Sequence, residues 1–229
     1  MSSNCRVIAI DGPGGAGKST VSRILGERLG FLHVDSGALY RIITWQCIER
    51  GVDMDDPASI AQAAGQIEIE CRPEGGRVAY YVGGEAPGDR IRTPQIDLNA
   101  SKVAREKPVR DKVTAILRSL SRLGDVVVEG RDITTAVFPD TPARLYLTAS
   151  VEARSARRRR QEAGLGLASR SEADVKAALL ARDTMDSTRK YAPLKKADGV
   201  VEIDSSDLTL DETVEAALAA LPAEWRAAR

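Results

Sequence analysis

A glycine-rich segment near the start of the chain has the residue types that bind a row of phosphates. Residues 12–19 read GPGGAGKS and fit the pattern G-x-x-x-x-G-K-[ST]. Glycine adopts backbone angles closed to other residues, so successive N–H groups can turn toward phosphate oxygens. Lys18 adds a positive charge near the β- and γ-phosphates, and the Ser19 hydroxyl is suited to bind Mg²⁺. The residues expected to hold a nucleoside triphosphate are Gly12, Pro13, Gly14, Gly15, Ala16, Gly17, Lys18, Ser19 and Thr20.

The elements around this loop occur in the order that the motif requires. An apolar strand is predicted at 7–10 and a helix at 18–29, with Gly30 as its end. A helix that starts at the loop points its positive end at the phosphates. A second strand at 31–34 and a helix at 38–50 follow. Consecutive strand–helix units indicate a parallel α/β sheet, and this context argues against a chance match to the motif.

Charged residues after the second predicted strand mark a candidate acceptor site. Ligands of open parallel sheets bind at the carboxyl ends of the strands. Asp35, Ser36 and Gly37 occupy that position, although Ser36 could also cap the helix that follows. Arg41 lies one turn into that helix, and an arginine fork matches a phosphate in a bidentate way.

A second group of charges follows the most apolar strand, DVVVE at 125–129. The composition of this strand indicates burial on both faces and a central place in the sheet. Arg131 and Asp132 follow it directly, where a site role is favoured. Two sets of helical residues would each be interpreted as solvated side chains if they stood alone. They are Ser101, Arg105 and Arg110, and Arg182, Asp186 and Arg189.

A run of arginines is predicted on a helix at 151–163 and has two interpretations. It could be an exposed basic face that binds nucleic acid, or a hinged lid, about 154–172, that closes over the triphosphate during transfer. Arg154, Arg157 and Arg158 share one helical face and are the favoured lid residues, with Arg158 as the catalytic candidate. Arg159 and Arg160 are expected to be solvated.

The pattern between residues 66 and 93 differs from its surroundings. Apolar and charged residues alternate, and the glycine pairs at 75–76 and 83–84 indicate turns. We predict a small antiparallel insertion there rather than a long loop. We expect the remainder to form one core at 5–65, 94–150 and 190–222, a five-stranded parallel sheet flanked by helices, in a single domain that spans residues 1–229.

Bulk composition excludes several classes of protein. The 229 residues include 33 basic and 33 acidic side chains, which argues against non-specific binding to nucleic acid or anionic membranes. No signal peptide or membrane span is visible. The three cysteines are far apart, and the single histidine cannot form a His-rich metal site. We therefore expect a reduced, cytoplasmic setting.

Several motifs in order resemble one family, the bacterial cytidylate kinases (CMP kinases) of the nucleoside monophosphate kinase group. The resemblance extends from about residue 7 to residue 221, and a set of ordered motifs is far more specific than any one of them. The motifs are DGPGGAGKST at 11–20, DSGALYR at 35–41, NASKVAREKPVR at 99–110, EGRDITTAVFPD at 129–140 and RDTMDSTRKYAPLKKADG at 182–199.

This resemblance implies a P-loop NTPase fold and transfer of the ATP γ-phosphate to CMP or dCMP with Mg²⁺, by a protein that is commonly a monomer. Ser101, Arg110 and Asp132 would face the base, with Arg182 and Asp186 at the sugar. Arg41 and Arg131 would face the phosphate. Lys18, Arg131, Asp132 and Arg158 are the implied catalytic residues. The implied acceptor site contains Asp35, Ser36, Gly37, Arg41, Ser101, Arg110, Arg131, Asp132, Arg182, Asp186 and Arg189.

Three other functions remain in competition at this stage. A small-metabolite kinase such as shikimate kinase shares a GKST loop, but the chain length and the insertion argue against it. A GTPase should carry an N-K-x-D motif, which is absent. A nucleic-acid-binding ATPase could use the arginine run, but zero net charge and the lack of an aromatic stacking platform weigh against it.

Overall fold

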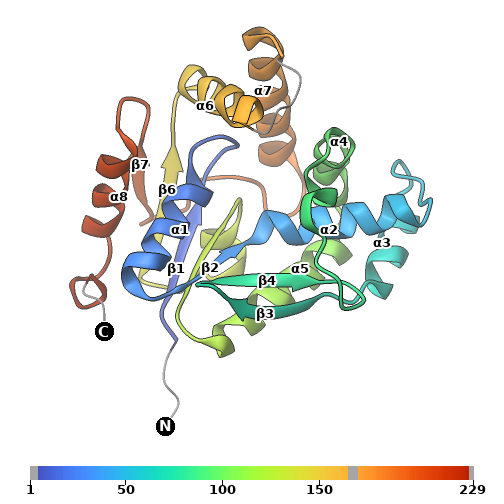
Figure 1. The fold of residues 1–229 in the computed structure, drawn as a ribbon, viewed down its shortest axis with the longest axis horizontal. Coiled ribbons are helices and arrows are strands. Elements are labelled where there is room, and N and C mark those ends of the chain that lie inside the picture. Colours follow the sequence, from blue (N-terminus) through green and yellow to red (C-terminus); the bar gives the residue numbers. More distant parts are fainter. Residues whose placement is uncertain (1–4, 165–169, 227–229) are drawn as a thin grey trace.

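The fold is organised around five parallel strands. It is seen in a computed structural model that describes residues 5–164 and 170–226. The strand order β2-β5-β1-β6-β7 puts the carboxyl ends of all five at the same edge of the sheet (Figure 1). The five are β1 (Val7–Asp11), β2 (Leu32–Asp35), β5 (Val126–Gly130), β6 (Ala143–Thr148) and β7 (Val201–Asp204).

An antiparallel hairpin extends this sheet, so the prediction of a five-stranded sheet with a separate insertion was incomplete. Strands β3 (Glu70–Glu74) and β4 (Arg77–Tyr81) form the hairpin. β4 pairs with β2 at His33 and Arg77, which gives seven strands in the order β3-β4-β2-β5-β1-β6-β7. The edge of β2 offers unpaired backbone groups, and the His33 N–H donates to the Gly76 carbonyl at 3.0 Å.

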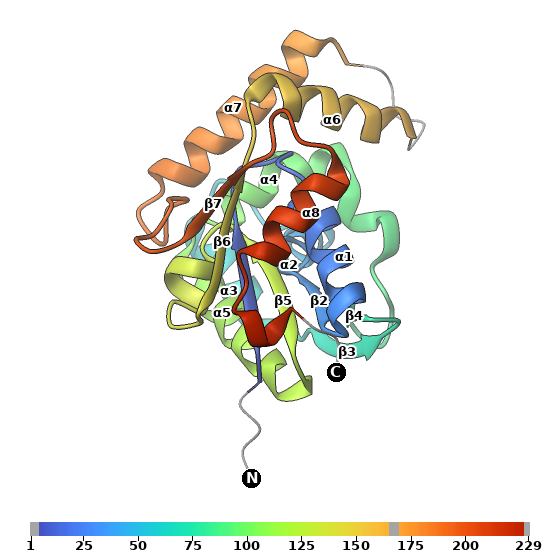
Figure 2. The same cartoon turned by 90° about the vertical axis from the view of Figure 1, so that its left-hand side faces the viewer.

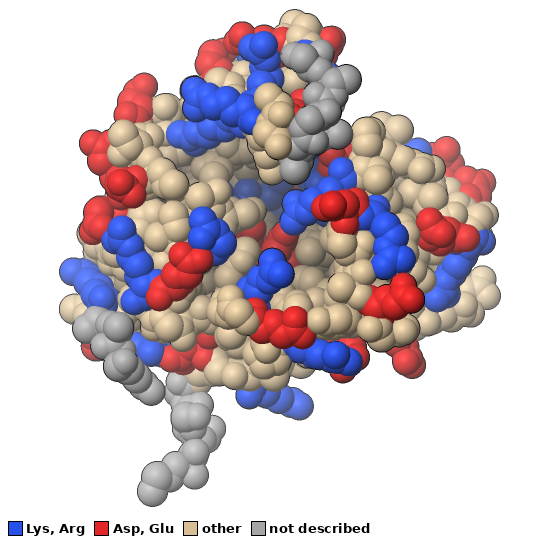
Figure 3. All heavy atoms as spheres, viewed as in Figure 1, with Lys and Arg blue, Asp and Glu red and all other residues tan. Residues whose placement is uncertain are grey.

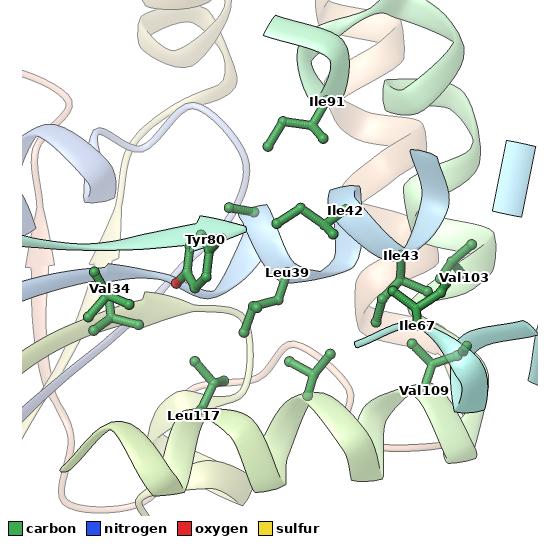
Figure 4. Close-up of a cluster of buried hydrophobic side chains, with 14 of the residues drawn as sticks. Val34, Leu39, Ile42, Ile43, Ile67, Tyr80, Ile91, Val103, Val109 and Leu117 are labelled. Carbon is green, nitrogen blue, oxygen red and sulfur yellow. The ribbon is translucent and has the colours of Figure 1, made fainter. Parts of the chain in front are cut away.

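The hairpin also supports the edge of the sheet where the acceptor site was predicted. The Tyr80 hydroxyl donates to the Asp35 carbonyl at 3.0 Å, at the last residue of β2. The Tyr80 ring is buried in the core beside Val34 and Leu39 (Figure 4). The predicted insertion therefore shares the core of the sheet through side chains as well as through backbone pairing.

Helices cover both faces of the sheet, because alternate side chains of the central strands point to opposite sides. In β5, Val127 joins the cluster beneath one pair of helices, α1 and α8, while Val126 and Val128 join the cluster beneath α2, α3 and α5. β1 divides its apolar residues in the same way, and all five of its residues are buried. These helices are α1 (Lys18–Leu29), α2 (Ser36–Glu49), α3 (Pro57–Gln66), α5 (Lys107–Leu120) and α8 (Leu210–Ala219).

Three more helices stand over the carboxyl edge of the sheet. α6 (Val151–Gly164) and α7 (Glu172–Thr188) form an upper lobe, and α4 (Pro94–Val103) faces it from the side of α2 (Figure 2). The expected lid at about 154–172 includes α6, but residues 165–169 lie outside the described residues. Its boundaries, like those of the core and the insertion, stay predictions.

Short helical turns complete the connections. The turns are the 3-10 helices η1 (Gly88–Arg92), η2 (Ser121–Leu123) and η4 (Ala223–Trp225), and the π-helical turn η3 (Ile133–Val137) directly after β5.

No helix among the described residues is both long enough and apolar enough to cross a membrane.

Candidate functional site

A cavity of about 1460 Å³ opens at the carboxyl edge of the sheet. Its walls are the loop before α1, the ends of β2 and β5, and residues of α4, α6 and α7. Figure 3 shows the hollow between the upper lobe and the body of the molecule, with basic side chains inside it. The predicted loop and most of the predicted acceptor residues therefore meet in one space.

The loop before α1 is held close to the sheet. Gly15 and Gly17 have φ angles of 78° and 91°, a region that favours glycine. A Cβ atom on Gly12 would lie 1.9 Å from the Leu147 carbonyl oxygen, so this position allows no side chain. The Lys18 ammonium is buried and donates to the Pro13 carbonyl at 2.8 Å. Burial, and then the nearby charge of Arg131, lower the pKa of Lys18 to about 7.

A buried carboxylate at the end of β1 fixes the segment that follows β5. Asp11 accepts the backbone N–H groups of Ile133 and Thr134, both at 2.8 Å, and the Thr134 hydroxyl at 2.6 Å. Burial raises the pKa of Asp11 to about 6 even though these hydrogen bonds oppose the shift. The anchored residues follow Arg131 and Asp132 directly. Asp11 therefore fixes the backbone position from which those two side chains extend.

A second buried carboxylate lies beside the loop and fits a metal site. Glu129 is 4% exposed, and its Oε1 has no hydrogen-bond partner. His33 Nε2 lies 3.7 Å from that oxygen. Burial opposes the charged form, but contacts with His33, Lys18 and Ser19 outweigh it and hold the pKa of Glu129 below its usual range.

The residue set near the loop suits Mg²⁺ better than a metal held by protein alone. The described residues contain no group of three or more His, Cys, Asp or Glu side chains that could hold a metal ion. Mg²⁺ commonly keeps several waters and binds through one or two protein oxygens together with substrate phosphates. Ser19 at the cavity wall and the free oxygen of Glu129 fit that requirement.

The floor of the cavity contains an arginine–carboxylate cluster. Asp132 and Arg110 are each 4% exposed and form a buried ion pair. Arg189 Nη2 lies 3.6 Å from Asp132 Oδ1, and Arg110 donates to the Ala104 carbonyl at 3.0 Å. The guanidinium carbon of Arg110 lies 5.5 Å from the centre of the Tyr40 ring. Asp132 lines the cavity, whereas Arg110 sits behind it.

Cationic side chains gather between the floor and the loop. Arg131 Nε donates to Asp186 at 3.1 Å. The Arg182 Nε is buried without a partner, and burial, followed by the charges of Arg131 and Arg41, lowers the pKa of Arg182 to about 10. Such a crowd of positive charge favours an anion, because an added negative charge offsets the repulsion.

The lid arginines make three different kinds of contact. Arg154 donates to the Gly14 carbonyl at 3.0 Å and pairs with Asp183 at 2.5 Å, while the Gly14 N–H donates to Asp183 at 3.2 Å. Arg157 donates to the Ser205 hydroxyl at 2.9 Å, just after β7. Arg158 pairs across the cavity with Asp97 of α4 at 2.9 Å.

Four predicted site residues do not line the cavity: Gly12, Pro13, Arg110 and Arg154. Gly12 packs against Leu147 of β6, and the Pro13 carbonyl accepts from Lys18. Arg110 and Arg154 stand behind residues that do face the cavity. Arg159 is exposed beside Glu172 at 3.6 Å, as expected, whereas Arg160 is exposed but also lines the cavity. The predicted residues that line it are Gly14, Gly15, Ala16, Gly17, Lys18, Ser19, Thr20, Asp35, Ser36, Gly37, Arg41, Ser101, Arg131, Asp132, Arg157, Arg158, Arg182, Asp186 and Arg189.

Sequence reasoning missed several acidic residues of the site. Asp11 and Glu129 could have been found, because both stand at the carboxyl ends of central strands. Asp97 and Asp183 lie on helices, where a single acidic residue is no signal of a site. Tyr40 was part of the quoted DSGALYR motif but received no role.

The sequence matches known proteins along nearly its whole length. The family model "Cytidylate kinase" matches residues 8–223. A cytidylate kinase of Streptomyces avermitilis is 42% identical over 225 residues, which cover 97% of this chain and 95% of that protein. A cytidylate kinase of Geobacter sulfurreducens is 39% identical, over 91% of this chain and 89% of that protein. A bifunctional pantoate ligase/cytidylate kinase of Synechococcus is also 39% identical, over 92% of this chain and 44% of that protein. The chain therefore belongs to the cytidylate kinase family.

Proposed function

We propose that this protein transfers the γ-phosphate of ATP to CMP, and also to dCMP, and so forms CDP or dCDP with Mg²⁺. The single observation that carries the proposal is that the phosphate-type loop and Asp132, which is paired with Arg110 behind it, face the same cavity. Two anionic nucleotides can then meet end to end in a cationic space. Family membership supports the same conclusion.

The donor nucleotide is assigned to the side of the cavity near α1 and α6. The loop N–H groups and Lys18 would bind the phosphates of ATP. The cavity continues past Arg157 to residues 205–210 after β7, which leaves room for the adenosine. Arg154 and Asp183 would act from behind the loop and keep its backbone in place.

The acceptor base is assigned to the floor of the cavity. Cytosine has an amino donor at position 4 and acceptors at N3 and O2. The Asp132 carboxylate would accept from the amine, and Ser101 would donate to a ring acceptor. Arg110, which stands behind Asp132, would hold that carboxylate in place. Uracil reverses the polarity at positions 3 and 4, so it would leave a buried carboxylate unpaired. Such a site discriminates strongly against UMP.

Phosphoryl transfer requires positioning and neutralisation of charge more than it requires a nucleophilic side chain. Arg41, Arg131 and Arg182 would hold the acceptor phosphate, and Arg158 would approach from the lid. Mg²⁺, when bound through Ser19 and Glu129, would supply charge neutralisation at the β- and γ-phosphates. A bound phosphate would offset the burial of Lys18 and favour its protonated form.

The nucleic-acid interpretation of the arginine run is not favoured by its contacts. Arg154, Arg157 and Arg158 are each engaged with groups inside the site rather than presented on an outer face. We further propose a cytoplasmic monomer that has no nucleic-acid or membrane partner. Size-exclusion chromatography with light scattering tests the oligomeric state.

A substrate panel tests the proposed function. The purified protein is supplied with ATP and Mg²⁺, and ADP formation is followed in a coupled assay with CMP, dCMP, UMP, AMP or GMP as acceptor. We expect rapid turnover with CMP and dCMP and much slower turnover with the others. Equal rates for all five acceptors, or no turnover with CMP, would overturn the proposal.

A further inference from the structure

One carboxylate bridges the two sides of the cavity and has no role in the proposed function. Asp97 lies in the first turn of α4. Its Oδ1 is 2.6 Å from Arg41 Nη2 of α2, and its Oδ2 accepts from Arg158 Nη2 of α6 at 2.9 Å. Asp97 therefore joins an arginine of the acceptor side to an arginine of the lid.

This bridge lies where an entering ligand can reach it. Asp97 Oδ1 is buried but has no aligned hydrogen bond, although Arg41 stands beside it. Arg41 directs its Nη1 to the Ile91 carbonyl at 3.2 Å instead. The Asp97 side chain is 28% exposed and lines the cavity, so an entering ligand can reach it.

The surroundings of Asp97 are strongly cationic. Burial opposes its charge, but Arg41, Arg158 and Arg182 outweigh burial and hold the pKa of Asp97 below its usual range. Arginine forks bind carboxylates and phosphates with the same donor geometry. A carboxylate between Arg41 and Arg158 thus fills the position in which a phosphate would find its donors.

We propose that Asp97 is a built-in competitor of the acceptor phosphate. Without a nucleotide, its carboxylate pairs with Arg41 and Arg158. When the nucleotide binds, its phosphate dianion replaces Asp97 as the partner of these two arginines. The inference rests on the proposed function, because it takes CMP as the acceptor. Asp97 then tunes affinity for the phosphate end of the nucleotide and leaves the base contacts unaffected.

The physical reason is repulsion between like charges in a partly dehydrated site. A dianion that approaches Arg41 must either displace Asp97 or remain close to its negative charge, and both reduce the gain from binding. The same repulsion favours release of the product after transfer. Removal of the charge while the shape is kept should therefore tighten binding of CMP.

The test is the variant Asp97→Asn, which is nearly isosteric and removes the charge. Binding of CMP and of cytidine is measured by calorimetry without ATP, so no turnover occurs. We expect the Kd of CMP to fall by about three- to tenfold at low salt, with a smaller gain at high salt. The Kd of cytidine, which has no phosphate, should stay unchanged.

Two matched variants separate charge from shape and from surface effects. Asp97→Glu keeps the charge and should bind CMP as the wild type does. Lys102 lies on the same helix as Asp97, and its ammonium pairs with Asp55 at 2.5 Å, away from the cavity. Asp55→Asn removes this ion pair and should change neither Kd. Thermal unfolding of each variant verifies that it is folded.

Some outcomes overturn the inference alone, and others overturn the proposed function. If Asp97→Asn binds CMP no more tightly than the wild type, or if its gain extends equally to cytidine, Asp97 does not compete with the phosphate. If Asp97→Asn does not fold, Asp97→Ser takes its place, and CMP binding no tighter than that of the wild type would equally reject the inference. Failure of the wild type to phosphorylate CMP would instead reject the proposed function.

Discussion

At the scale of single residues, the site uses burial to set the charge states that it needs. Lys18 and Asp11 flank the loop in the sequence and have pKa values of about 7 and about 6. Both shifts arise mainly from burial, which disfavours the charged form of either group. Burial deprives the Lys18 ammonium of the solvation that it would have in water. A bound phosphate can offset that loss.

Proton uptake on ATP binding measures this relief. At pH 8 an amine with a pKa of about 7 is mostly neutral, whereas the phosphates of bound ATP favour the ammonium. Calorimetry in buffers of different ionisation enthalpy should therefore show uptake of up to about one proton per ATP at pH 8. Proton uptake should vanish in Lys18→Met. If this variant still takes up a proton on ATP binding, a group other than Lys18 is responsible.

The same shift predicts a pH dependence of stability. The pKa of Lys18 is lower in the folded protein, so the unfolded chain binds more protons between about pH 7 and the ordinary lysine pKa of 10.5. The contribution of Lys18 to the free energy of unfolding should therefore rise with pH in this window. In chemical denaturation, the free energy of unfolding of Lys18→Met should not show that rise with pH. The same variant should lose roughly 10²–10³-fold in kcat. An identical slope in both proteins would contradict the shift.

At the scale of elements, the loop before α1 is supported from two sides, by β6 and by the lid helices. Gly12 has a φ of 151° and no room for a Cβ against the Leu147 carbonyl. Gly12→Ala should lower the free energy of unfolding by about 2–4 kcal/mol and weaken ATP binding. The matched control is Gly65→Ala in α3, where nothing lies within 4 Å, and this change should be neutral or slightly stabilising. Equal stability of the two variants would contradict this close approach.

The support from the lid is tested by Asp183, which contacts both Gly14 and Arg154. Asp183→Asn leaves the buried Arg154 without its counter-ion, so we expect the Kd of ATP to rise about five- to tenfold while that of CMP is nearly constant. Glu172→Gln removes an exposed ion pair between the same two helices and should have little effect. Equal weakening of ATP and CMP binding by Asp183→Asn would show a general loss of structure instead.

The elements were more predictable than their connections. The bounds of α1 agree with the prediction, because Gly30 gives a local signal for a helix end. The hairpin pairs with β2 at one register position, His33 with Arg77, and the sequence carries no local signal for that pairing. Likewise, strand ends revealed Arg131 and Asp132, but Asp97 on α4 depends on tertiary placement.

At the scale of the whole molecule, the two proposed nucleotide sites share one cavity between the body and the upper lobe. A molecule that joins adenosine and cytidine through five phosphates should occupy both sites at once. Its Kd should lie well below that of ATP or CMP alone, because the second contact becomes intramolecular. The diadenosine counterpart is the control and should bind more weakly. Equal affinity of the two compounds would show that the cytosine floor is not engaged.

The central claim is that Asp132 at the floor of this cavity chooses cytosine while the loop holds ATP. The most direct measurement is the ratio of kcat/KM for CMP over UMP in the wild type and in Asp132→Ala, with the Kd of ATP determined for both. We predict a large ratio in the wild type, a fall of at least about tenfold in the variant and an unchanged Kd for ATP. If the variant loses activity toward CMP and UMP in equal proportion, Asp132 does not read the base and the account is wrong.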